Sequence, residues 1–106
     1  MLLTMAGAKS GQARLTPLEY FTIEGRTVII GTYDGAPENP TWAHNLRANP
    51  MAHIEICAES YDVAARELPA DERDALFSSL VERAGRMGGY RTRTTRMFPI
   101  FELRRI

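Results

Sequence analysis

Short stretches of alternating or continuous apolar side chains recur along the sequence and predict a chain built mainly from β-strands. Residues 15–23 are rich in β-branched and aromatic side chains, and Glu24-Gly25-Arg26 supplies a turn. Residues 27–32 follow with the apolar run Val28-Ile29-Ile30. These two stretches are predicted to pair as a β-hairpin.

The second half of the chain repeats the strand pattern. Residues 53–57 alternate apolar and polar side chains, and residues 61–65 do the same after a turn at residues 58–60. A last strand is expected at residues 98–103. The chain is therefore predicted to contain five or six antiparallel strands.

Two segments predict helices. The first is the short segment 40–48, which Asn49-Pro50 ends. The second begins at Pro69 with an acidic first turn, which suits a helix N-terminus, and ends at Gly85. Its apolar positions at helical spacing are Leu76, Phe77, Leu80, Val81 and Ala84. The predicted fold is mainly β (α+β): a small β-barrel closed by one packed helix and a short loop helix, in a single domain over residues 1–106.

Composition fits a soluble protein, with 44% hydrophobic and 25% charged residues in 106. No apolar run approaches the roughly 20 residues of a membrane-spanning helix. Residues 1–5 are too short for a signal peptide and lack its basic region. Cys57 has no partner for a disulfide, so we expect a cytoplasmic protein in which Cys57 is a small core side chain.

The formal net charge is zero, but the charges are unevenly distributed along the chain. Residues 55–82 hold eight acidic and two basic side chains, and residues 83–106 hold seven arginines and one glutamate. Either the two blocks pair with each other or lie on solvated faces, or the arginines join Lys9 and Arg14 in a basic groove for an anionic ligand. An isoelectric point near 6.7, without a recognisable binding module, argues against nucleic acid as that ligand.

The segment Gly7-Ala8-Lys9-Ser10-Gly11-Gln12-Ala13-Arg14 has the composition of a phosphate site. Turn amides, an ammonium, a hydroxyl and a planar guanidinium are all donors that an anion accepts from. The segment is not a P-loop, because its Lys-Ser pair precedes the second glycine. An exposed turn between two strands would have the same composition, so both interpretations stay open.

A second segment joins the loop Gly35-Ala36-Pro37 to the short helix that carries Trp42, the only tryptophan. Taken with the first segment, it favours a phosphate-bearing, flat-ringed cofactor held between two loops. Trp42 alone is more typical of a core residue. We expect His44 on a helix surface and His53 as a hydrogen-bonded neighbour in a strand. No side chains show metal-ligand spacing or a nucleophile and base pair.

Three blocks of residues occur in one order along nearly the whole chain. The first is Gly7-x-Lys9-Ser10-Gly11-Gln12-x-Arg14 with Pro17-Leu18. The second is Gly35-Ala36 with Asn39-Pro40-x-Trp42-x-x-Asn45-Leu46-x-Ala48-Asn49-Pro50, and the third is Tyr90-x-x-x-Thr94-x-Arg96-x-x-Pro99. Together they resemble the deazaflavin-dependent nitroreductase family. The resemblance implies an FMN-binding-like split β-barrel that binds coenzyme F420, a deazaflavin with a phosphate and an oligoglutamate tail.

The resemblance also implies roles for individual residues. The implied cofactor-binding residues are Lys9, Ser10, Gly11, Arg14, Gly35, Ala36, Pro37, Pro40 and Trp42. The first four would bind the phosphate and the start of the tail. The loop at residues 35–37 would lie along the ring, with Pro40 and Trp42 as the wall beside it. Tyr90 falls where the family has a tyrosine facing the substrate.

The chain departs from the family pattern in several places. Asp34 replaces a common glycine and Glu38 a commonly basic residue, and acidic groups there would disfavour an anionic tail if they face it. Met87 stands for an aromatic residue near the substrate, which predicts a looser pocket. The family's N-terminal helix, which covers the site or meets a membrane, is expected to be missing; peripheral membrane association stays open.

The predicted function is reduction of a small electron-poor acceptor (a nitroaromatic, a quinone or an enone) by hydride transfer from reduced F420. The Tyr90 hydroxyl is the predicted catalytic donor of a proton or hydrogen bond to the developing anion. The alternatives are an FMN-dependent oxidoreductase on the same barrel and a cofactor-binding or storage protein without turnover. The sequence is compatible with a monomer and with a homodimer.

Overall fold

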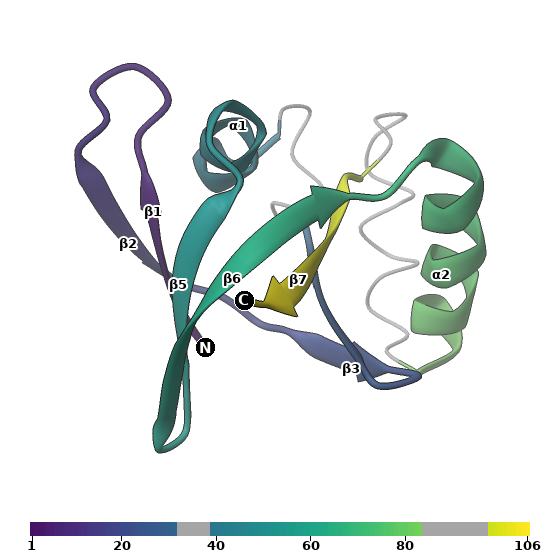
Figure 1. Ribbon diagram of the computed structural model, residues 1–106. Helices are drawn as coiled ribbons and strands as arrows, with labels where there is room; N and C mark the ends of the chain where they lie inside the picture. The colour runs from purple at the N-terminus through teal and green to yellow at the C-terminus, as the bar shows by residue number, and fades with distance from the viewer. Residues whose placement is uncertain (32–38, 84–97) are drawn as a thin grey trace.

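The computed structural model describes residues 1–31, 39–83 and 98–106, which form one antiparallel sheet and two helices (Figure 1). The strands of this described part are β1 (Leu2–Ala6), β2 (Ala13–Pro17), β3 (Phe21–Ile23), β4 (Arg26–Ile30), β5 (Met51–Ile56), β6 (Glu59–Glu67) and β7 (Ile100–Arg105). The helices are α1 (Thr41–Ala48) and α2 (Ala70–Arg83).

The sheet order β2-β1-β5-β6-β7-β4-β3 places two consecutive strands at opposite edges. β2 ends at Pro17 and β3 begins at Phe21, so a three-residue connection joins the two edges. Four Cα steps span at most about 14 Å, whereas seven flat strands would be about 29 Å wide. The sheet therefore curls towards closure, as Figure 1 shows. The predicted mainly β barrel with two helices is confirmed.

The single strand predicted over residues 15–23 is divided into β2 and β3, and β1 lies outside the predicted ranges, so the described part of the chain has seven strands where five or six were expected. The last contact of this part of the chain with β1 is a reciprocal pair, in which the Leu18 amide donates to the Met1 carbonyl over 2.9 Å and the Met1 ammonium donates to the Leu18 carbonyl at 3.2 Å. Beyond this pair the chain crosses to the opposite edge of the sheet and begins β3 at Phe21. The predicted hairpin survives only as β3 and β4, whose turn residues Glu24 and Gly25 have φ of 52° and 76°.

One face of the sheet packs against α1 and forms the larger core. Helix α1 turns Trp42, Ala43 and Leu46 towards the sheet, and the Trp42 ring meets Phe101 edge to face at a centroid distance of 5.8 Å. The buried residues of this core are Leu3, Met5, Ile29, Trp42, Ala43, Leu46, Ala52, Ile54, Val63, Phe101 and Leu103. The expectation that Trp42 belongs to the interior is confirmed.

The opposite face packs against α2 around a second core, formed by Ile23, Val28, Leu68, Leu76, Leu80 and Ile100. Buried Glu102 lies beside this core on β7. It accepts hydrogen bonds from Arg66 Nη1 at 3.4 Å and Arg104 Nε at 3.2 Å, and Arg66 Nη2 donates to Glu72 of α2 at 2.6 Å. These contacts join β6, β7 and the first turn of α2.

The turn between β5 and β6 begins one residue earlier than predicted. Cys57 starts it with φ of 54° and is exposed, so the expectation of a core cysteine is wrong. The two histidine predictions are confirmed. His53 Nδ1 lies 2.8 Å from Asp62 Oδ1 on the neighbouring strand, and His44 is exposed on α1.

Candidate functional site

The β1–β2 connection, residues 7–12, is here called the anion loop. Its own backbone closes it: the Gly7 amide donates to the Gln12 carbonyl at 2.8 Å, and the Gly11 amide donates to the Gly7 carbonyl at 2.9 Å. Ser10 Oγ accepts from the Gln12 amide at 3.2 Å. Gly11 has φ of 70°, a conformation that glycine adopts without strain. The sequence therefore builds a tight turn with Lys9 at its exposed tip.

The side chains of Ser10 and Arg14 converge on Gly7. A Cβ placed on Gly7 would lie 3.0 Å from Ser10 Oγ and 3.3 Å from Arg14 Nε, so glycine leaves room for both. Arg14 pairs in register with Met5, which places both on the sheet face that packs against α1. The structure thus brings together the predicted phosphate residues Ser10, Gly11 and Arg14 in one corner, with Lys9 beside them.

The donors of the anion loop are available to a ligand. Lys9 and Arg14 are exposed, and neither forms an ion pair with a carboxylate in the described part of the chain. Within the same residues, the amides of Lys9 and Ser10 donate to no protein acceptor. Two cations and unused turn amides in one loop form a donor set that fits a phosphate group.

Asn45 joins the anion loop to α1 and was given no role from the sequence. Its side chain is 5% exposed, and its Oδ1 accepts a hydrogen bond from the Ala8 amide at 2.9 Å. The available signal was a polar residue on the apolar face of α1, between Trp42 and Leu46. Such a residue needs a polar partner when it is buried.

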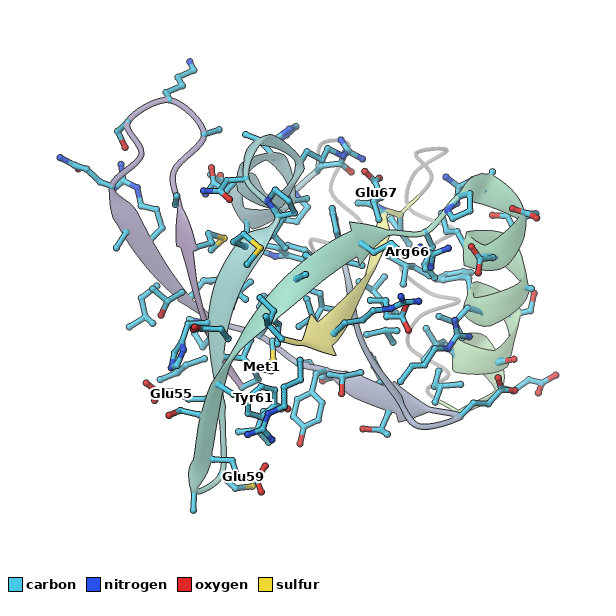
Figure 2. All side chains as sticks on the ribbon, in the orientation of Figure 1. Met1, Glu55, Glu59, Tyr61, Arg66 and Glu67 are labelled. Carbon is cyan, nitrogen blue, oxygen red and sulfur yellow. The ribbon has the colours of Figure 1, made fainter. Side chains whose placement is uncertain are left out.

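Helix α1 is fixed to the sheet close to the anion loop. Arg47 Nε and Nη2 donate to the two oxygens of Glu67 at 2.8 and 2.7 Å, a paired geometry that fixes orientation as well as distance. These hydrogen bonds raise the pKa of Arg47. Glu67 and the preceding Arg66 lie near the end of β6 (Figure 2), and their side chains point to opposite faces of the sheet.

Three chain segments meet at Gly31. This buried glycine donates its amide hydrogen to the Pro99 carbonyl over 2.8 Å. A Cβ there would lie 2.8 Å from Pro99 Cγ and 3.3 Å from Pro40 Cδ, so no side chain fits without moving a proline. Gly31 and Pro40, on either side of segment 32–38, and Pro99, shortly after segment 84–97, therefore share one tightly packed junction.

Several predicted site residues lie outside the described residues. Gly35, Ala36 and Pro37 belong to segment 32–38, together with Asp34 and Glu38. Tyr90 and Met87 belong to segment 84–97. Pro40 and Trp42 are described and buried, so a ligand would meet each of them through a small exposed fraction.

Metal-binding side chains do not gather in groups of three or more within residues 1–31, 39–83 and 98–106. Neither α1 nor α2 has the length and apolar character that crossing a membrane requires.

Comparison with known proteins identifies the family. The sequence model of the F420H(2)-dependent quinone reductases matches residues 1–104. The chain belongs to this family. A relative in Mycobacterium tuberculosis, described as an F420H(2)-dependent quinone reductase, is 34% identical over 99% of this chain and 72% of its own length.

Solved structures agree with this assignment. One titled as an F420-H2 dependent reductase superposes with a TM-score of 0.82 at 33% identity, covering 96% of this chain and 90% of the other. A second, titled as a domain-swapped dimer, has the same TM-score and identity and covers 96% and 77%. A FAD-binding protein from Mesorhizobium loti, at 18% identity and a TM-score of 0.58 over 99% and 79%, shares the fold alone.

Proposed function

We propose that this member of the family binds coenzyme F420 with its phosphate at the anion loop and Arg14. The observation that carries the proposal is the convergence of Lys9, Arg14 and the unused Lys9 and Ser10 amides in one exposed corner beside α1. A phosphate accepts from cations and backbone amides at once, and a paired surface arginine would not be free to bind it. The family description supports F420 as the group that carries this phosphate.

The proposed reaction is reduction of a small electron-poor acceptor, with a quinone favoured over a nitroaromatic or an enone. The bound reduced deazaflavin supplies a hydride equivalent. The chain's contribution is placement, with Lys9, Ser10, Gly11 and Arg14 on the phosphate. In the proposal, Gly35-Ala36-Pro37 lies along the ring and Pro40 and Trp42 back it.

Titration of the purified protein tests cofactor choice. Oxidised F420 and FMN are added separately, and binding is followed by the change in their fluorescence. The proposal requires tighter binding of F420. Reduced F420 and a quinone are then supplied together, and oxidation of the coenzyme is followed by absorbance. Binding without oxidation would favour a storage protein, and preference for FMN would favour a flavin enzyme.

Tyr90→Phe tests the proposed donor to the acceptor. The hydroxyl matters as charge builds on the acceptor, so turnover should fall about tenfold to a thousandfold while F420 affinity stays the same. Tyr61→Phe, a tyrosine on β6 whose ring lies under the Arg105 guanidinium, is the control and should keep full turnover. Unchanged turnover in Tyr90→Phe would remove Tyr90 from the catalytic residues.

We also propose a homodimer formed through the β2 edge. β2 pairs only with β1 among the described strands, and its Leu15 side chain is 64% exposed. An exposed strand edge pairs readily with a second chain, and a domain-swapped dimer is known for a 33% identical protein. Sedimentation velocity of wild type and Leu15→Lys tests this: wild type should be dimeric, and the variant should be shifted towards monomer.

A further inference from the structure

One side-chain hydrogen bond links the anion loop to α1. Asn45 Oδ1 accepts it from the Ala8 amide, which is 37 positions away in the sequence. A buried polar side chain on an apolar helix face costs free energy unless its polar atoms are hydrogen-bonded. We propose that Asn45 is a positioning residue that holds the anion loop where Lys9 and Arg14 can bind the phosphate together.

The anion loop gains from such a tether because, within one protomer, the strand that follows it pairs with the described sheet along one side only. β2 lies at the sheet edge, and four of its five residues are exposed. The loop's internal hydrogen bonds fix its shape but not its position relative to α1. A loop that is ordered only when a ligand arrives lowers the affinity by the cost of ordering. The Asn45–Ala8 bond removes part of that cost beforehand.

Helix α1 is a firm reference for the tether. Its Trp42 and Leu46 side chains are buried in the larger core, and the Arg47–Glu67 pair fixes it to β6. Asn45 therefore fixes the position of the anion loop relative to α1 and the larger core.

This inference rests on the proposed function, and its test compares two ligands. One is intact F420, and the other is the same deazaflavin without the phosphate and tail. Asn45→Ala should weaken F420 binding by about three- to tenfold, the factor that corresponds to one net hydrogen bond. Affinity for the phosphate-free ring should not change. Asn45→Leu keeps the branching at Cγ without the acceptor and leaves no cavity. It should weaken F420 binding as Asn45→Ala does, which separates loss of the hydrogen bond from loss of packing.

Asn49→Ala is the matched control. Asn49 follows the same helix, and its Oδ1 also accepts from a backbone amide, that of Met51 at 3.2 Å, but it does not touch the loop. It should leave both affinities unchanged. Hydrogen exchange of the Ala8 amide, measured without any ligand, should become faster in Asn45→Ala and stay as in wild type in Asn49→Ala.

The outcomes separate the inference from the proposed function. Wild type that binds no F420 would contradict the proposed function, whereas the exchange of the Ala8 amide would still report on the tether. Wild type that binds F420, with Asn45→Ala and Asn45→Leu binding it equally well, would overturn the inference alone. Equal losses for F420 and the phosphate-free ring would also overturn it, because they indicate a general structural role. A smaller effect of Asn45→Ala in a Lys9→Ala background would support it, since both then act through the phosphate.

Discussion

Basic side chains at two ends of the molecule have the same charges but different surroundings. Arg66 and Arg104 hydrogen-bond to the buried carboxylate of Glu102, and Arg66 also reaches Glu72 of α2. Lys9 and Arg14 are exposed at the β1–β2 end and meet no carboxylate among the described residues. A charge paired with a carboxylate stabilises the fold, whereas an unpaired charge is available to bind a ligand. The comparison predicts that substitutions at one end change stability and substitutions at the other change binding.

Removing the unpaired cations should give the largest effect. Lys9→Ala and Arg14→Ala should each weaken F420 binding by about 1.5 to 3 kcal/mol, the size of a charge-assisted hydrogen bond. Their free energy of unfolding should change little, since neither forms an ion pair with a carboxylate of residues 1–31, 39–83 or 98–106. Arg14→Lys should recover part of the affinity, because lysine keeps the charge without the planar fork. Fluorescence titration measures the affinities.

Arg26→Ala is the control for these variants. Arg26 lies in the β3–β4 hairpin at the opposite end of the molecule (Figure 1), with Glu24 4.0 Å away. Arg26→Ala removes one positive charge, as Lys9→Ala and Arg14→Ala do, and should leave F420 affinity unchanged. Wild-type affinity in both Lys9→Ala and Arg14→Ala would contradict the phosphate assignment.

Removing the buried carboxylate of Glu102 should lower stability and leave F420 affinity unchanged. Glu102→Ala leaves Arg66 and Arg104 without their shared partner and should lower the free energy of unfolding by about 1 to 3 kcal/mol. F420 affinity should hold, since this cluster lies beside α2 and away from the anion loop. Urea denaturation measures the stability. Exposed Glu55→Ala on β5 is the control, expected to change it by less than about 0.5 kcal/mol. A loss of F420 affinity in Glu102→Ala, with stability retained, would contradict the assignment of paired charges to stability and unpaired charges to binding.

Two glycines with similar positive φ sharpen the comparison between the two ends of the molecule. Gly11 and Gly25 have φ of 70° and 76°, and a Cβ on either would meet no atom within 4 Å. Alanine at each should therefore cost about 1 kcal/mol of stability through backbone strain alone. Only Gly11→Ala, in the anion loop, should also weaken F420 binding. Equal affinities in the two variants would mean that the shape of the loop does not matter for the coenzyme.

The smallest effect is expected at the exposed Arg47–Glu67 pair, which joins α1 to β6. Arg47→Ala should lower the free energy of unfolding by about 0.2 to 1 kcal/mol, since Arg47 and Glu67 are both partly exposed. A double-mutant cycle with Glu67→Ala isolates the coupling, which salt should reduce. A coupling well above this range would indicate that the pair belongs with the buried cluster of Glu102.

Much of the fold follows from local pattern. Alternating residues predict β5 and β6, and the acidic first turn with helical spacing predicts α2. The division of residues 15–23 could not be predicted in this way, because it depends on β2 and β3 pairing with different strands, β1 and β4, at opposite edges of the sheet. The prediction of a buried Cys57 was wrong because the β5–β6 turn begins one residue earlier than expected. Alternation of apolar and polar residues does not locate the first residue of a turn.

The candidate site shows the same limit. Lys9, Ser10 and Arg14 lie within six positions of one another, so the sequence alone could group them. The role of Asn45 depends on an amide 37 positions away. That of Glu102 depends on Arg66, which lies on a neighbouring strand. In the sequence, the Asn45–Ala8 and Glu102–Arg66 contacts are indicated only by a polar residue among apolar neighbours.

The junction at Gly31 has a consequence for how the family can diverge. Gly31 and Pro40 lie on either side of segment 32–38, and Pro99 lies shortly after segment 84–97. A side chain at position 31 would displace one of the two prolines and so disturb the attachment of both segments to the sheet at once. In the proposed function these segments hold the coenzyme ring and the acceptor. We therefore expect related sequences to keep glycine at position 31 even where the acceptor differs.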